Sequence, residues 1–337
     1  MPRVDVVVPC YNYGRFLEQC VGSVLSQSDV SVRVLIIDDA SSDDTSEIGR
    51  SLATREPRVE YRRHAVNRGH IATYNEGLLQ WAGSDYSLLL SADDYLLPGT
   101  LARAVAVMDC NPEIGFVFGP AFELRPGDPP PTPLSGEIAE ARVIDGIEFI
   151  KMSGAHNIVP TATAVVRTKL QKQLGGYRPD LPHAGDMEMW LRFAVNGQVG
   201  MLTTPQAVYR RHDSNMSLSF FVDRVLTLPD MRQRALVFAT FFAEQAPRLP
   251  DLPRLRALTI DALAKEATWQ AHAAFEAGQF DVCRELADFA AATCPGVRRT
   301  RPWLSLALKR LLGHRAWSTL APLAARAHNL RQTRAAG

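Results

Sequence analysis

Short apolar runs alternate with segments of helical periodicity through the first 90 residues of the chain. The apolar runs, typical of strands, cover residues 4–8, 32–37, 59–62 and 86–90. Between them, helical spacing of apolar residues covers 16–25, a segment from the capping pair Asp43-Asp44 to Arg55, and 71–82. Strands that alternate with helices predict an α/β fold, with an open, mostly parallel sheet flanked by helices on both faces.

The second half of the chain loses the strand signal. A mixed pattern runs from residue 143 to about 219, and after Phe220 the segments are rich in Ala, Leu and Arg and are broken by prolines. Residues 258–276 and 282–293 flank a turn at Gly278 and predict a helical hairpin of the tetratricopeptide type. We therefore predict two domains, an α/β domain over residues 1–220 and an α-helical C-terminal domain over 221–337.

The charge of the chain is balanced in total and uneven in distribution. The net charge is +1, yet residues 298–334 contain eight arginines and Lys309 without a carboxylate, which leaves −8 for the rest. Leucines and Trp303 are interleaved with these cations, a mixture typical of segments at a membrane surface. Three interpretations stay open for this basic tail: contact with anionic lipid or a lipid-linked acceptor, a packed helix, or a nucleic-acid arm. Nucleic acid ranks last, and we predict no such partner, because Trp303 and Trp317 are too few aromatics for a stacking groove.

The cysteines and the N-terminal residues indicate a compartment. The five cysteines are scattered and odd in number, without the paired spacing of a zinc site, which favours a reducing environment. The charges of Arg3 and Asp5 and the stop at Pro9 do not fit a signal peptide, and no run reaches the roughly 18 apolar residues of a membrane span. We expect a cytoplasmic protein, peripheral at most at the inner face of the membrane.

Polar clusters follow two of the predicted strands. Asp38-Asp39 comes after the second strand, and Ser91-Ala92-Asp93-Asp94 comes after the fourth. Ligands of open α/β sheets bind at the carboxyl ends of the strands, so both clusters are candidate site residues. No glycine-rich phosphate loop follows any strand, which argues against dinucleotide-dependent oxidoreductases, P-loop enzymes and nucleotidyltransferases.

Several motifs in a fixed order resemble the family 2 glycosyltransferases of GT-A fold. These motifs are Val6-Val7-Val8-Pro9-Cys10-Tyr11-Asn12, Ser23-Val24-Leu25-Ser26-Gln27, Ile36-Ile37-Asp38-Asp39-Ala40-Ser41-Ser42-Asp43-Asp44-Thr45, Asn67-Arg68-Gly69 with Asn75, Ser91-Ala92-Asp93-Asp94, Gly185-Asp186-Met187-Glu188-Met189-Trp190-Leu191-Arg192 and Tyr209-Arg210-Arg211-His212. The resemblance covers residues 4 to about 217. It implies a GT-A, Rossmann-like sheet, a nucleoside-diphosphate sugar donor, a divalent cation (Mg²⁺ or Mn²⁺) and transfer with inversion.

The resemblance implies a role for the acidic element, Ser91-Ala92-Asp93-Asp94. Asp94 would coordinate the cation that bridges the diphosphate, and Asp93 would support the ribose or the water shell of the metal. His212 would be a further metal ligand, and Arg211 would neutralise diphosphate charge as the leaving group departs. The alternative is structural, since adjacent aspartates after a strand also cap loops and a histidine in a basic loop is often a surface residue.

The same resemblance implies the donor pocket. Asp39 would accept a hydrogen bond from the imide N–H of a uracil or thymine, beside the ring of Tyr11, while Asp38 serves its own turn. The remaining residues that would shape or line this pocket are Pro9, Asn12, Asn67, Arg68 and Asn75. An alternative for Asn67-Arg68-Gly69 is a simple turn.

Asp186 stands at the start of an amphipathic helix, where backbone N–H groups favour and position a carboxylate. The family usually has Glu-Asp here, and Gly185-Asp186 keeps only the aspartate, so the resemblance implies Asp186 as general base and Glu188 as a substitute. The alternative is an N-cap without chemistry.

We therefore expect a glycosyltransferase that moves a sugar from a nucleoside-diphosphate donor, with a UDP-sugar as first candidate, to a hydroxyl of a glycan, a lipid-linked acceptor or a small molecule. The competing hypothesis is a non-catalytic nucleotide-sugar sensor that acts through its helical domain. Release of nucleotide from a donor discriminates between the two. A homo-oligomer remains open.

Overall fold

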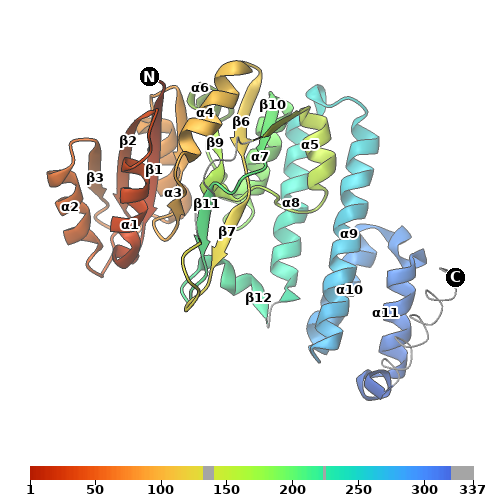
Figure 1. Cartoon of the computed structure of the whole chain (residues 1–337). Coiled ribbons are helices and arrows are strands. Elements are labelled where there is room, and N and C mark those ends of the chain that lie inside the picture. The colour runs from red at the N-terminus through yellow and green to blue at the C-terminus, as the bar shows by residue number, and fades with distance from the viewer. Residues whose placement is uncertain (132–139, 223–224, 320–337) are drawn as a thin grey trace, which may run out of the picture. The chain divides into compact units, whose positions relative to one another are not determined.

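The computed structural model describes residues 1–131, 140–222 and 225–319. Its main feature is an eight-stranded sheet in the order β3-β2-β1-β4-β9-β6-β10-β8 (Figure 1). These strands are β1 (Arg3–Cys10), β2 (Ser31–Asp38), β3 (Val59–Arg63), β4 (Tyr86–Leu89), β6 (Ile114–Phe118), β8 (Ala141–Ile144), β9 (Val165–Arg167) and β10 (Gln198–Leu202). The four strands predicted from the sequence are confirmed and pair in parallel, as expected.

The rest of the sheet is mixed. The short strand β9 runs antiparallel to both β4 and β6, and β8 runs antiparallel to β10, whereas β10 and β6 are parallel. A second sheet joins β5 (Tyr95–Leu96), β11 (Ala207–Arg210) and β7 (Ala121–Leu124). Because β5 and β11 pair next to the acidic element, this small sheet brings residues 209–212 to the end of β4.

Helices cover both faces of the parallel strands, which explains why those strands are apolar without alternation. Residues 4, 6 and 8 of β1 share one core cluster with α1 (Gly14–Leu25) and α4 (Thr100–Cys110). On the opposite face, Val7 meets Gly77, where an added Cβ would lie 2.2 Å from Val7 Cγ1. The remaining helices of this region are α2 (Thr45–Arg55), α3 (His70–Asn75), α5 (Gly146–Ser153), α6 (Thr168–Leu174) and α7 (Gly185–Val195).

The predicted helix over 71–82 is confirmed to residue 81, but its geometry changes halfway. The α-helical geometry ends with α3, and Glu76–Trp81 continues as a π-helical turn. π-turns are rare and gather at functional sites, and this one carries the Glu76 side chain described below.

The chain divides into two compact units. One holds Met1–Asn215 with Ala239–Leu252, and the other holds Met216–Phe238 with Pro253–Gly337. A short hairpin, β12 (Phe221–Val222) with β13 (Val225–Leu226), precedes α8 (Leu228–Gln245), which spans both units. The separation into a catalytic domain ending at residue 220 and a helical domain from 221 stays a prediction.

The second unit contains the predicted helical hairpin. α9 (Leu252–Glu276) and α10 (Phe280–Thr293) form this hairpin (Figure 1). Gly278 between them has φ +77°, the left-handed conformation that glycine adopts without strain. Small buried residues, among them Ala267, Ala271 and Ala287, permit close packing of this unit. α11 (Arg301–Leu312) follows. Among the described helices, we find none with the length and apolar character needed to cross a membrane.

Candidate active site

Three parallel strands end at one edge of the sheet and place the predicted donor residues there. In the register of β1 with its neighbours, Cys10 pairs with Asp38 and Val7 pairs with Leu89. The residues that follow, including Tyr11 and Asp39, therefore emerge at the same edge, as do the residues of the acidic element.

Asp39 holds the loop that follows β3. Its carboxylate accepts hydrogen bonds from the backbone N–H groups of Arg68 (2.8 Å) and Gly69 (2.9 Å), and it is 3% exposed. The Asn67 side chain accepts from the N–H of Gly69 (3.0 Å), which makes the turn that was the alternative interpretation of this segment. The structure thus joins Asp39, Asn67 and Arg68 in one cluster, as predicted for the donor pocket. Their contact with a nucleotide stays a prediction.

His64 lies between two carboxylates and was missed in the sequence. Its Nδ1 lies 2.6 Å from Asp39 Oδ1, and its Nε2 lies 3.1 Å from Glu76 Oε2, which also accepts from the Arg68 guanidinium (2.8 Å). The imidazole is buried. A signal existed, since His64 directly follows β3 at the strand edge that carries Asp39.

The structural role expected of Asp38 is confirmed. Its carboxylate accepts from the backbone N–H of Ser41 (2.8 Å), the Tyr61 hydroxyl (2.7 Å) and the Arg63 guanidinium (3.1 Å). It is fully buried, so it has no surface for a ligand.

The loop after β1 is fixed by Asn12. Its side-chain oxygen accepts from the N–H of Ser42 (2.8 Å), and its own N–H donates to the Ser41 hydroxyl (2.9 Å). Asn12 has φ +58°, a conformation that asparagine tolerates better than most residues. Pro9 is buried in β1, and the Tyr11 side chain is 49% exposed, so its ring is accessible to a base.

The acidic element meets the loop after β11. Asp93 Oδ2 lies 3.1 Å from His212 Nε2 and 3.3 Å from Asn215 Nδ2. The imidazole packs against the rings of Tyr13 and Phe16, with centroids 5.3 and 5.2 Å away. The structure therefore unites residues 119 positions apart, as the family resemblance implied.

Asp94 is as buried as Asp93. The two are 3% and 4% exposed, and Asp94 accepts a hydrogen bond from the backbone N–H of Arg210 (3.0 Å). Burial and the charge of Asp93 raise the pKa of Asp94 well above its usual range. Arg210 in turn donates to the backbone carbonyl of Asp93 (2.7 Å), so its guanidinium braces the acidic element.

Asp186 lies in the first turn of α7, as predicted. Its carboxylate accepts from Asn157 Nδ2 (2.7 Å), from the Thr161 hydroxyl (3.2 Å) and from the backbone N–H of Met187 (2.7 Å). Burial raises its pKa, although the bonds from Met187 and Thr161 oppose that effect. Asn157 and Thr161 were missed in the sequence because no local pattern links them to Asp186.

Tyr74 connects the two acidic centres. Burial raises the pKa of its phenol, and the charges of Asp186 and Asp93 add to that rise. The half-buried Tyr74 phenol is thus within electrostatic range of both carboxylates.

Glu188 cannot substitute as the base. Its side chain is fully buried, and its Oε1 lies 2.7 Å from Arg192 Nε, four residues further along α7. The expectation that Glu188 could replace Asp186 as base is corrected, because an acceptor hydroxyl could not reach this buried carboxylate.

Two other predicted residues are engaged by protein groups. The Asn75 amide donates to the carbonyl of Tyr177 (2.9 Å) and accepts from its N–H (2.7 Å), so it braces the segment before α7. Arg211 pairs with Glu123 at 2.8 Å. Donor contact by Asn75 and diphosphate contact by Arg211 stay predictions.

Asp93 and His212 have side chains of the kind that ligate divalent cations. Across the described residues, we find no group of three or more His, Cys, Asp or Glu side chains arranged to hold a metal. Asp93 and His212 nevertheless offer one carboxylate and one imidazole side by side. Mg²⁺ at phosphate-bearing sites is bound by one or two carboxylates plus phosphate oxygens and water, and an imidazole ligand such as His212 favours Mn²⁺ over Mg²⁺.

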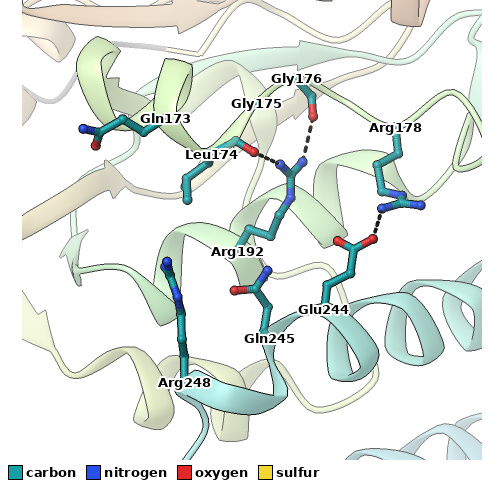
Figure 2. Close-up of a pocket in the computed structure, with 9 residues that line it drawn as sticks. All are labelled: Gln173, Leu174, Gly175, Gly176, Arg178, Arg192, Glu244, Gln245 and Arg248. Atoms are coloured by element: carbon teal, nitrogen blue, oxygen red, sulfur yellow. Dashed lines mark hydrogen bonds and ion pairs between the residues drawn. The ribbon is translucent and has the colours of Figure 1, made fainter.

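A pocket of about 370 Å³ lies elsewhere in the same unit, next to the end of α6 and residues 244–248 (Figure 2). Figure 2 shows Arg192 donating to the carbonyls of Leu174 (2.6 Å) and Gly176 (2.7 Å), and Arg178 pairing with Glu244 (2.5 Å). None of the predicted site residues lines it. Arg192 and Arg178 are thus already paired with protein groups, and we assign no ligand to this pocket.

Residues 5–165 match the family model described as Glycosyl transferase family 2. The chain carries a family 2 glycosyltransferase domain. The enzyme is 31% identical over 120 residues to the GalNAc(5)-diNAcBac-PP-undecaprenol beta-1,3-glucosyltransferase of Campylobacter jejuni, across 35% of this chain and 38% of that protein. Among curated relatives, the matched segment spans from 10% to 80% of the relative's own length.

Two solved structures resemble the fold of this glycosyltransferase. S. aureus TarS 1–349 in complex with UDP-GlcNAc has a TM-score of 0.55 at 18% identity, over 86% of this chain and 91% of that chain. The mannosyltransferase PcManGT from Pyrobaculum calidifontis, in complex with GDP-Man and Mn²⁺, has a TM-score of 0.54 at 20% identity, over 92% and 87%. These likenesses confirm the predicted α/β fold with a helical C-terminal region.

Proposed function

We propose that this glycosyltransferase transfers a sugar from a UDP-sugar to an acceptor hydroxyl with inversion, with Asp186 as the general base. The observation that carries the proposal is the setting of Asp186. The Asp186 carboxylate is half-buried, and this burial raises its pKa. Hydrogen bonds from Asn157 and Thr161 fix its orientation. A base with a raised pKa accepts a proton more readily, and a fixed one needs no reorganisation.

The reaction requires one displacement. The Asp186 carboxylate takes the proton of the acceptor hydroxyl, the hydroxyl oxygen forms a bond to the anomeric carbon, and the bond from that carbon to the diphosphate oxygen breaks. Because attack and departure occur on opposite faces, the configuration inverts. A bound Mg²⁺ or Mn²⁺ supplies positive charge that stabilises the diphosphate leaving group.

We assign that cation to the acidic element, with Asp94 and His212 as ligands and Asp93 beside them. Asp93 Oδ2 lies 3.1 Å from His212 Nε2, and Asp94 Oδ1 accepts from the backbone N–H of Arg210; both carboxylates are buried. The mannosyltransferase neighbour, solved with GDP-Man and Mn²⁺, supports a metal-assisted reaction on a nucleotide sugar.

The donor base is assigned to Asp39. A carboxylate that keeps one oxygen lone pair free can accept the imide N–H of uracil. Tyr11 has an exposed ring and follows Cys10, whose carbonyl accepts from the backbone N–H of Asp39. The TarS neighbour with UDP-GlcNAc supports UDP. The relative named for an undecaprenol-linked substrate supports a glycan or lipid-linked acceptor.

The test is nucleotide release from a panel of UDP-, GDP- and dTDP-sugars by the purified full chain. Asp186→Asn should retain UDP affinity and lose roughly 10²–10⁴-fold in turnover. In the unchanged enzyme, kcat/KM should fall as pH decreases through a pKa above 3.8. The reason is that Asp186, whose pKa is raised, takes up a proton and stops acting as a base at a higher pH than an ordinary aspartate does.

The control is Asp180→Asn, the same substitution at a carboxylate that is largely exposed and pairs with Arg178. It should leave turnover and the pH profile unchanged. Near-normal turnover by Asp186→Asn would remove this residue from the role of base. Binding of UDP without release of nucleotide from any donor would identify a sensor instead of an enzyme.

A further inference from the structure

α11 has two apolar faces, of which its own unit covers one. Leu306 is 1% exposed and packs inward. Leu304, Leu308 and Leu311 are 57%, 51% and 83% exposed. Their spacing of four and three residues places them on one stripe, roughly opposite Leu306. We call these three residues the leucine stripe.

The inward contacts of α11 do not involve the leucine stripe. Lys309 lies 2.6 Å from Glu276 at the end of α9, and Trp317 Nε1 donates to the same carboxylate (3.1 Å). Lys309 also lies 4.7 Å from the centroid of the Trp317 ring. Part of the basic tail is thus packed structure, as one interpretation of the sequence held. Leu306 and Lys309 therefore do not belong to a surface that contacts lipid. Residues 320–334 of the basic tail lie outside the described residues.

Five arginines accompany the leucine stripe. They are exposed and lie at positions Arg298, Arg299, Arg301, Arg310 and Arg315. Residues 298–319 contain no carboxylate, and within the described part of the chain none of these arginines forms an ion pair. α11 and the segments on either side of it thus combine exposed apolar side chains with uncompensated positive charge.

We propose that the leucine stripe and these five arginines dock the enzyme on an anionic lipid bilayer. Apolar side chains gain by entering the boundary between headgroups and acyl chains, and each arginine gains from the negative surface potential. A second copy of the same face would bring five more arginines against the first five, which is repulsive. Nucleic acid would need stacking rings, and Trp317 is already used by Lys309 and Glu276.

The experiment is sedimentation of the full chain with vesicles of phosphatidylglycerol and phosphatidylcholine, against phosphatidylcholine alone. Binding should require the anionic lipid and weaken as salt rises. Leu304→Ser with Leu311→Ser should lower partitioning at least about tenfold through lost apolar burial. Arg301→Gln with Arg315→Gln should lower it roughly 30-fold, from about 1 kcal/mol per cation.

The matched control is Leu236→Ser with Leu258→Ser. These leucines of the same unit are 39% and 49% exposed and lie outside α11, so partitioning should stay at the level of the unchanged chain. Equal melting temperatures show that all variants fold. Absence of binding at low salt, or a leucine-stripe variant that binds like the control, would refute the proposal. So would light scattering in which the unchanged chain is a dimer and the leucine-stripe variant a monomer, since the occupant would then be a second copy.

Discussion

At the residue scale, the most informative contact is that of His64 with Asp39 and Glu76, which the sequence did not predict. Both imidazole nitrogens lie within hydrogen-bond distance of carboxylate oxygens, at 2.6 and 3.1 Å, so the ring links Asp39 to Glu76. An imidazole held at both nitrogens fixes the plane of the Asp39 carboxylate, which we assign to the donor base.

We predict that His64→Ala raises the donor KM about tenfold or more and changes kcat little, because one hydrogen bond to a charged group is lost. The preference for UDP over CDP should also decline, since cytosine lacks the imide N–H that an oriented Asp39 would accept. Steady-state kinetics and nucleotide competition measure both effects. His272→Ala, in the other compact unit, serves as control. An unchanged ratio of UDP to CDP affinity would show that His64 only supports the fold.

The residues predicted from sequence were those that local pattern can reveal. Asp39 and Asp93 follow strands, and Asp186 begins a helix, so their positions can be anticipated from chain order. Their partners cannot. Asn157 lies 29 residues before Asp186, and Asn215 lies 122 residues after Asp93, so only the folded chain unites them.

At the element scale, helix α5 depends on a close approach that only glycine permits. A Cβ on Gly146 would lie 1.6 Å from the backbone oxygen of Ala194 in α7, and backbone cannot move aside cheaply. Gly22 in α1 has no heavy atom within 4 Å of an added Cβ.

Gly146→Ala should therefore lower the free energy of unfolding by roughly 1–3 kcal/mol. Gly22→Ala should raise it by up to about 1 kcal/mol, the helix propensity difference. Chemical denaturation of both variants makes the comparison. A Gly146→Ala variant as stable as the parent chain would mean that α5 and α7 are not packed as described.

Elements were predictable where the pattern is long, and not where it is short. The strands β1 and β2 have eight residues each, whereas β9 has three and owes its place to β4 and β6. The π-helical geometry of Glu76–Trp81 could not be predicted, because the spacing of its apolar residues resembles that of an α-helix. A long-range partner, Val7 against Gly77, accompanies the change of geometry.

At the scale of the whole molecule, ligand binding should stabilise the folded chain. UDP with Mn²⁺ should raise the melting temperature by a few degrees, more than either alone, since ligands that bind only the native state stabilise it by mass action. EDTA should cancel the increment due to the metal. His212→Ala should abolish that increment while uridine, which has no diphosphate, binds as before. An EDTA-insensitive effect of UDP and equal stabilisation of His212→Ala would contradict the cation assignment.

The position of β9 has a consequence for synthesis on the ribosome. β9 inserts between β4 and β6, although it is made about 50 residues after β6. Until residue 167 has emerged, the strands on either side of it present open edges, the kind of surface that pairs with other nascent chains. The last strand that β4 needs is also among the shortest of the sheet. The time during which the nascent chain exposes these edges to aggregation thus depends on the synthesis of a three-residue strand.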